Sequence, residues 1–153
     1  MAGMNALRTL LLLSASVLCA VALSAATKPD FTGTWKLNVE KSDLGGAPIT
    51  SVVVQIQHKD PTFTYTAKGA ADGQDFEESE TFTTDGKASQ DSRGGTLKAQ
   101  WDGEVLVTEA TGPDGNPAYT SRMALSADGK TTIRDHLPAN DQEPKRHEIY
   151  EKQ

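Results

Sequence analysis

Residues 31–37 read Phe-Thr-Gly-Thr-Trp-Lys-Leu, and this stretch decides the fold. Phe31, Gly33, Trp35 and Leu37 share one face of an extended chain, whereas the polar residues between them share the other face. Alternation with period two and one apolar face is typical of a β-strand that is buried on one side only. The stretch therefore predicts a half-buried strand.

The same alternation recurs along the rest of the chain. It is clear at 52–58, 63–67, 97–101 and 119–125, and weaker at 76–83, 87–91, 104–110, 130–136 and 146–151. Five Asp-Gly dipeptides lie between or beside these runs, at 72–73, 85–86, 102–103, 114–115 and 128–129. Asp-Gly suits tight turns that need positive φ, because Asp tolerates that region and Gly has no Cβ to clash. Short strands separated by such turns predict an antiparallel all-β domain.

Strands of this kind must protect their edges, and closing the sheet into a barrel does so. We predict a single antiparallel up-and-down β-barrel of about eight to ten strands over residues 27–153, since no long crossover connection is visible. A two-sheet sandwich remains the alternative. The stretches 81–87 and 124–130 echo each other, and we interpret them as the same hairpin chemistry used twice.

Residues 1–26 differ from the rest of the chain. Arg8 is their only charged side chain, residues 10–23 are an apolar run, and Ser24-Ala25-Ala26 resembles a cleavage site. This pattern predicts a secretory signal peptide, because the run is shorter than the ~20 residues that a membrane-spanning helix needs. An uncleaved membrane helix is the alternative. The residues before Cys19 match a bacterial lipidation site poorly.

Cleavage would leave residues 27–153 with 14 Lys and Arg against 21 Asp and Glu, a net charge of −7. An acidic chain argues against nucleic acid and against anionic membrane surfaces as partners. Cys19, the only cysteine, would leave with the leader, so the remainder suits an oxidising compartment. We therefore expect a secreted or periplasmic monomer without a stable membrane span.

Three short motifs give the chain a resemblance to a known superfamily. Gly33-Thr34-Trp35 resembles the Gly-x-Trp of the first strand of calycins, which include the lipocalins and the fatty-acid-binding proteins. Trp101-Asp102-Gly103 and Ile149-Tyr150-Glu151-Lys152 are similar to stretches of the fatty-acid-binding branch. The resemblance implies a secreted bacterial lipocalin-like barrel that binds a small molecule.

The chain departs from the fatty-acid-binding pattern at two places. Residues 40–48 are too short for the helix–turn–helix lid of that branch. That branch also reads a ligand carboxylate with an Arg-x-Tyr pair in the last strand. Here Tyr150 is present, but Glu148 stands at the arginine position and Arg146 lies two residues earlier. Because Glu148 would repel a fatty acid carboxylate, we expect the same barrel fold but not a fatty acid as its ligand.

The predicted inward faces provide the candidate binding residues. The candidates for the barrel lining are Tyr65, Phe82, Tyr119, Ser121, Met123, Arg146 and Tyr150. Glu78, Glu80 and Gln90 share the inward parity, which indicates a polar interior unless a bulge shifts the register. We assign structural roles to Gly33, Trp35 and Trp101, with Trp35 closing the floor of the barrel and Trp101 capping one end.

The sequence offers no catalytic site, since no nucleophile and base can be named together. No histidine pair has metal-ligand spacing, and the acidic stretch 75–80 lacks the spacing of a calcium loop. We therefore expect no metal and no cofactor. The leading hypothesis is an exported barrel that binds a small hydrophobic or amphipathic molecule. The alternative is a non-catalytic structural or interaction module of the cell envelope with a filled barrel, and an enzyme is a third, weaker hypothesis.

Overall fold

A computed structural model describes residues 27–153, and within them the chain forms ten β-strands and no helix. The predicted leader, residues 1–26, lies outside the described residues. The strands are β1 (Gly33–Leu37), β2 (Ile49–Lys59), β3 (Thr62–Ala71), β4 (Gln74–Thr83), β5 (Asp85–Gln90), β6 (Thr96–Asp102), β7 (Val105–Thr111), β8 (Pro117–Leu125), β9 (Thr131–Pro138) and β10 (Arg146–Lys152).

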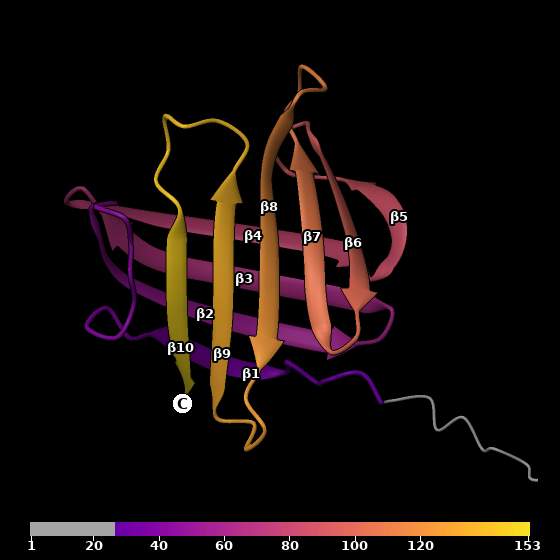
Figure 1. Cartoon of the computed structure of the whole chain (residues 1–153), viewed down its shortest axis with the longest axis horizontal. Helices are drawn as coiled ribbons and strands as arrows, with labels where there is room; N and C mark the ends of the chain where they lie inside the picture. The colour runs from indigo at the N-terminus through magenta and orange to yellow at the C-terminus, as the bar shows by residue number, and fades with distance from the viewer. Residues whose placement is uncertain (1–26) are drawn as a thin grey trace, which may run out of the picture.

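All ten strands belong to one antiparallel sheet. Its order is β4-β3-β2-β1-β10-β9-β8-β7-β6-β5, so consecutive strands are neighbours and β1 pairs with β10. Strands β1–β4 lie across strands β6–β10 and enclose the interior between them (Figure 1). The predicted up-and-down barrel is confirmed and is nearly closed. The two strands at the ends of the order, β4 and β5, are not hydrogen-bonded to each other.

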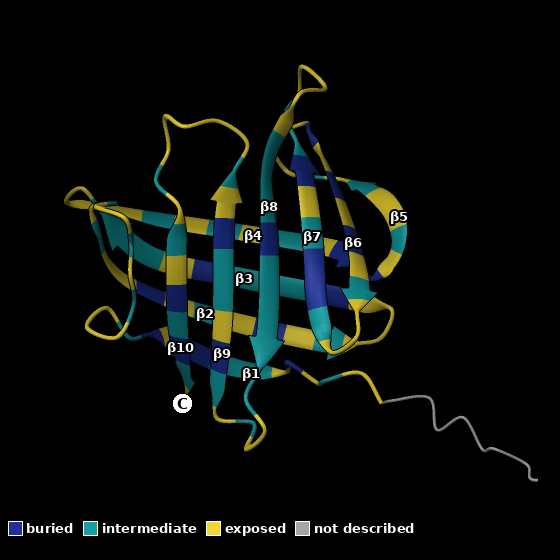
Figure 2. Ribbon diagram, viewed as in Figure 1, coloured by how far each residue is buried: buried dark blue, intermediate teal, exposed yellow. Residues whose placement is uncertain are grey.

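The predicted inward faces form the core. Burial alternates along the strands, as the banded ribbons of Figure 2 show. On β2, for example, Val52 and Ile56 are buried while Ser51 and Gln55 are exposed. Each strand therefore buries one face, which is the physical reason why a chain of modest apolar content encloses a core.

The floor of the barrel is aromatic. Phe31 and Trp35 are 0% and 1% exposed, and the Trp35 indole N–H donates a hydrogen bond of 2.8 Å to the Phe31 carbonyl. The Phe31 ring stacks on Trp101 with centroids 6.2 Å apart. Gly33, which lies between Phe31 and Trp35 in the chain, has φ +144°, a conformation that favours glycine. Both tryptophans thus occupy one end of the barrel.

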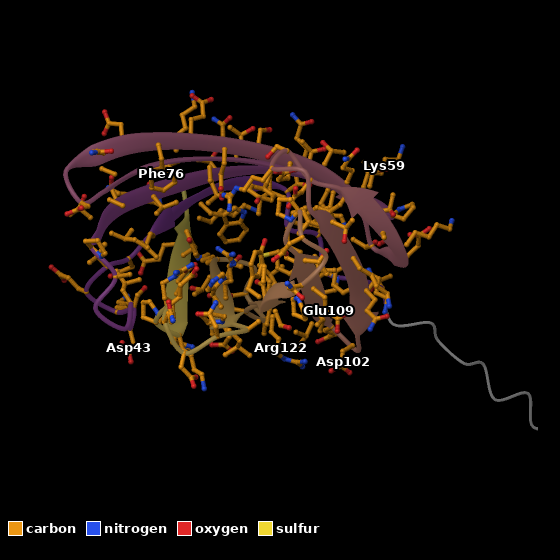
Figure 3. All side chains as sticks on the ribbon, turned by 90° about the horizontal axis from the view of Figure 1, so that it is seen from above. Asp43, Lys59, Phe76, Asp102, Glu109 and Arg122 are labelled. Atoms are coloured by element: carbon orange, nitrogen blue, oxygen red, sulfur yellow. The ribbon has the colours of Figure 1, made fainter. Side chains whose placement is uncertain are left out.

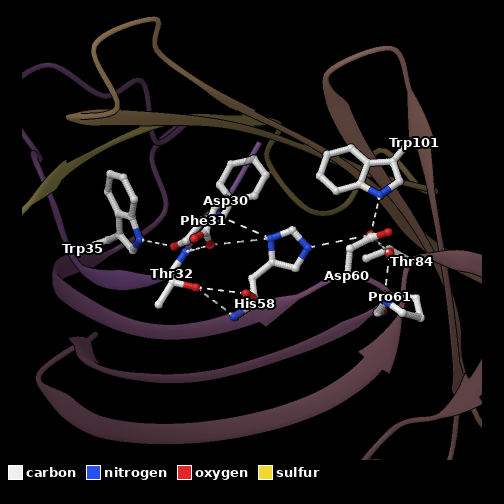
Figure 4. A network of polar contacts seen from close by, with 9 residues as sticks. All are labelled: Asp30, Phe31, Thr32, Trp35, His58, Asp60, Pro61, Thr84 and Trp101. Carbon is white, nitrogen blue, oxygen red and sulfur yellow. Dashed lines mark hydrogen bonds and ion pairs between the residues drawn. The ribbon is translucent and has the colours of Figure 1, made fainter. Parts of the chain in front are cut away.

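A polar network ties the segment before β1 to the turn between β2 and β3 (Figure 4). The His58 ring accepts a hydrogen bond from the Phe31 amide at its Nδ1, with 3.4 Å between the nitrogens. Its Nε2 lies 3.8 Å from Oδ1 of Asp60, which also accepts bonds from Thr84 and from the Trp101 indole. These bonds, that from Thr84 first, hold the pKa of Asp60 below its ordinary value. The floor is therefore fixed by polar contacts as well as by packing.

Four of the five Asp-Gly dipeptides form turns between paired strands, but Asp85-Gly86 does not. It opens β5, which pairs with β6 rather than with β4. The interpretation of 81–87 as a second hairpin is therefore wrong. Asp-Gly supplies the positive φ, here 80° at Gly86, but it does not decide which strands pair. Residues 85–90 carry no large apolar side chain that would pack beside β4.

Candidate ligand-binding cavity

The barrel holds a cavity of about 180 Å³. An apolar protein cavity of about 150 Å³ is large enough to bind benzene. The interior is therefore neither solid nor as large as the ~300–1,000 Å³ of a typical ligand site. Figure 3 shows the barrel and its side chains from above. Asp102 and Arg122, labelled there, form an ion pair on the outer surface, with Oδ2 and Nη2 3.0 Å apart.

One wall of the cavity is mainly apolar. It is built by β1–β4, whose inward side chains cross the interior in successive rows. The apolar lining residues from these strands are Trp35, Ile49, Val52, Val54, Ile56, Phe63, Ala67, Phe76 and Phe82. A surface of this kind favours an apolar ligand body, because contact removes apolar area from water.

The opposite wall is mixed: Leu97, Leu106 and Met123 make part of it apolar. Its polar part centres on Glu148 of β10, whose side chain is 3% exposed. Its carboxylate accepts three hydrogen bonds: from Arg146 Nε at 2.8 Å, from the Tyr150 hydroxyl at 2.9 Å and from Arg134 Nη1 at 3.3 Å. Arg134 Nε also donates to the Ser121 hydroxyl at 3.1 Å. Two guanidinium groups thus share one carboxylate, and this cluster carries a net charge of +1.

The cluster sets the ionisation of its members. Burial raises the pKa of Glu148, but the charges of Arg134 and Arg146 outweigh burial and hold that pKa below its ordinary value. Burial, followed by the same two arginines, lowers the pKa of His136 to about 4. Burial also raises the pKa of Tyr150. At neutral pH, therefore, Glu148 is charged, whereas His136 and Tyr150 are neutral.

Two phenol hydroxyls add polar groups to the cavity, one from each wall. Tyr65 on β3 and Tyr119 on β8 both line the cavity, and neither hydroxyl has a hydrogen-bond partner among residues 27–153. Burial raises the pKa of each, so both stay protonated and can donate. Tyr119 packs against His136, with ring centroids 4.7 Å apart. The cavity therefore offers neutral donors beside the net positive charge of the Glu148 cluster, while Glu78, which also lines the cavity, is paired with Arg93.

All seven candidate residues from the sequence, Tyr65, Phe82, Tyr119, Ser121, Met123, Arg146 and Tyr150, line this one cavity. Whether they contact a ligand stays a prediction. Of the polar residues expected to point inward, Glu78 lines the cavity and Glu80 binds the turn after β5. Gln90 is exposed, because β5 turns away from the register of β4, and the expectation for it was wrong.

Sequence reasoning missed Arg134 and His136, both of which point inward from β9. Thr132, Arg134 and His136 occupy alternate positions and so share one face of β9. Because that face is polar, it did not stand out as an inward face. The sequence analysis also treated Glu148 as an isolated charge that repels a carboxylate. It did not identify the partners of Glu148, which come from β9 as well as β10.

Within residues 27–153, no group of three or more His, Cys, Asp or Glu side chains is placed to hold a metal ion. No helix among these residues is long and apolar enough to cross a membrane.

The fold defines the class of protein only as far as architecture: residues 27–153 form a nearly closed, antiparallel up-and-down β-barrel of ten strands, and several solved structures share this fold. The fluorescent protein UnaG superposes with a TM-score of 0.61 at 18% identity, covering 80% of this chain and 97% of UnaG. The secretory abundant heat soluble protein 4 of Ramazzottius varieornatus gives 0.55 at 12% identity, covering 81% and 95%. The fatty acid transporter REP1-NXSQ, as a point mutant, gives 0.54 at 11% identity, covering 80% and 97%. No protein-family model and no curated protein sequence matches the chain. At these identities the likeness establishes the fold alone.

Proposed function

We propose that this protein is an exported barrel that binds one small amphipathic molecule. Its apolar body lies against β1–β4 and its polar, negatively charged head lies against the Glu148 cluster. The observation that carries the proposal is the pair Arg134 and Arg146 facing the single carboxylate of Glu148. A charge left over in a poorly hydrated interior attracts an anion more strongly than it would in water.

The hydroxyl donors that line the cavity support the same ligand class. The hydroxyls of Tyr65 and Tyr119 have no protein partner in residues 27–153, so an acceptor on the ligand satisfies them without breaking an existing bond. Glu148 does not repel such a head as a bare carboxylate would, because three donors already engage it. The volume of about 180 Å³ favours a compact ring system over a long acyl chain.

A matched series of naphthalenes tests this proposal. We expect 2-naphthoate to bind the purified protein at least about tenfold more tightly than 2-naphthylmethanol, since about 1.4 kcal/mol from one net charge suffices for that ratio. The cation 2-naphthylmethylamine should bind most weakly. Isothermal titration calorimetry measures all three. Equal affinities would refute the charged head, and no binding by any of them would favour the filled scaffold.

Export is a separate part of the proposal. It is supported by the tripartite pattern of residues 1–26 and by the lack of cysteine in residues 27–153. Expression of the full chain in a bacterium, fractionation and N-terminal sequencing provide the test. We expect protein outside the cytoplasm that begins near Thr27. Protein that keeps Met1 would contradict the proposed cleavage.

A further inference from the structure

The ring of strands has one break within residues 27–153, between β4 and β5. The chain leaves β4 and enters β5 at a corner, where the Thr84 amide still bonds to the Pro61 carbonyl on the side of β3. From this corner β5 diverges to pair with β6 (Figure 1). The two strand edges that face the break are thus not joined by backbone ladder bonds.

Two side-chain contacts cross this break, and both join β4 to the turn that follows β5. The Glu80 carboxylate accepts hydrogen bonds from the Ser92 amide, at 3.0 and 3.2 Å, and from the Ser92 hydroxyl. The Arg93 guanidinium forms an ion pair with Glu78. Both acceptors belong to β4 and both donors belong to the turn, so the two contacts form a latch.

The turn at 91–95 is held in shape by hydrogen bonds of its own. The Asp91 carboxylate accepts bonds from the amides of Arg93, at 3.0 Å, and Gly95, at 2.7 Å. A Cβ on Gly95 would lie 2.1 Å from the Thr111 carbonyl oxygen, so this backbone approach requires glycine. The turn is therefore ordered by its own bonds, and opening the latch does not require it to unfold.

Glu78 connects the latch to the cavity. It lines the cavity together with Phe76 and Tyr65, yet its side chain is 32% exposed. The Arg93 side chain is 70% exposed on the outer side of the same pair. A molecule that passes Arg93 and Glu78 therefore moves from solvent directly to the cavity wall.

The two ends of the barrel have contacts of a different kind. The aromatic floor closes one end. At the other end, the loop after β1 is joined to β10 by two backbone bonds between Asp43 and His147, of 2.9 and 2.7 Å. The side chains of the Arg93–Glu78 ion pair are 70% and 32% exposed, and exposed ion pairs contribute little to stability, so only a small free energy opposes opening of this pair.

We propose that the ligand enters and leaves through the break between β4 and the turn at 91–95, with Glu78–Arg93 and Glu80–Ser92 as its latch. This inference rests on the proposed function. An anionic head competes with Glu78 for the guanidinium of Arg93, so the ligand itself loosens the ion pair as it arrives. Arg93 is thus the first protein cation that such a ligand meets at the break.

The test locks the break and measures exchange. The paired substitutions Glu80→Cys and Ser92→Cys, joined by a short thiol cross-linker, tie β4 to the turn. The control joins Thr64→Cys and Thr81→Cys, which lie opposite each other on the paired strands β3 and β4. The variants are made on residues 27–153, which contain no other cysteine. Stopped-flow tryptophan fluorescence follows 2-naphthoate binding and release before and after cross-linking.

We expect cross-linking of the break to slow both association and release at least about tenfold, and cross-linking of the control to leave both rates within twofold. Unchanged rates in the cross-linked break would overturn this route. Equal slowing in the control would overturn it too, because general stiffening would then be the cause. As a second measurement, Arg93→Gln should speed release. The absence of equilibrium binding by the unmodified protein would overturn the proposed function, whereas normal binding with unchanged exchange overturns the route alone.

Discussion

Replacing Glu148 by Gln removes one charge from the interior while keeping the size of the side chain. The carboxylate accepts from Arg134, Arg146 and Tyr150, so all three of its neighbours are donors. A glutamine amide offers one oxygen and one NH₂ group, and the NH₂ group must face a donor. The substitution therefore loses at least one hydrogen bond and raises the net charge of the cluster from +1 to +2.

The magnitude follows from burial. Breaking a fully buried ion pair by removing one partner costs about 3–5 kcal/mol. Glu148 is 3% exposed, but Arg134 keeps 30% of its side-chain surface accessible and can recover some solvation. We therefore expect a loss of about 2–3 kcal/mol in the free energy of unfolding. The same change should strengthen 2-naphthoate binding by about tenfold, because one more uncompensated charge faces the head of the ligand.

Urea unfolding followed by the fluorescence of Trp35 and Trp101 measures the first effect, and calorimetry measures the second. Glu151→Gln is the matched control on the same strand. Glu151 faces outward, is 44% exposed and pairs with Lys41, so its loss should change stability by less than about 1 kcal/mol. If Glu148→Gln were as stable as the unmodified protein and bound naphthoate no more tightly, the coupling of these charges would be refuted.

Two further predictions concern the floor and His136. Trp35→Ala should lower the free energy of unfolding by about 3–5 kcal/mol, because a buried indole and its bond to the Phe31 carbonyl are lost; a loss under about 1 kcal/mol in urea unfolding would contradict the buried floor. His136 takes up its proton near pH 4 in the folded state and near 6.5 when unfolded, so stability should fall as the pH drops through this window. The limit is about 3 kcal/mol, at about 1.4 kcal/mol per pKa unit, and thermal unfolding of His136→Gln should show a flatter pH dependence over pH 4–6.5.

The barrel was predictable because alternation reports burial directly. On β2, β3 and β8 the apolar residues of each alternating run point inward, as the sequence indicated. The break after β4 was not predictable in the same way. Asp85-Gly86 has the local chemistry of a hairpin, but pairing depends on contacts with β6, a distant property that the dipeptide does not encode. The latch residues Ser92 and Arg93 escaped notice for the same reason.

The cavity was predictable in part. Alternation sufficed to place Tyr65 and Tyr119 in it, because each belongs to a strand with a mainly apolar inward face. Tyr150 was placed through the resemblance of the last strand to the fatty-acid-binding pattern, since the inward face of β10 is polar. On β9 the pattern is inverted: Ile133 and Leu137 are 36% and 37% exposed, whereas His136 is buried. Hydrophobic alternation alone would predict that Ile133 and Leu137 point inward and that His136 points outward, the reverse of the observed orientation. The true orientation of β9 follows from its pairing with β8 and β10, which the sequence does not state.

This inversion bears on the choice between a ligand-binding barrel and a filled scaffold. A scaffold gains stability by burying Ile133 and Leu137 and by exposing Arg134, and one-residue slippage of β9 would do both. The chain instead keeps two guanidinium groups inside and provides Glu148 and Ser121 as their acceptors, while the Tyr150 hydroxyl donates to Glu148. Buried ion clusters are often no more stable than the apolar residues that could replace them. Stability of the barrel therefore does not account for the Glu148 cluster, whereas the anionic ligand head that we propose does. In this proposal Glu148 offsets one of the two positive charges while the cavity is empty.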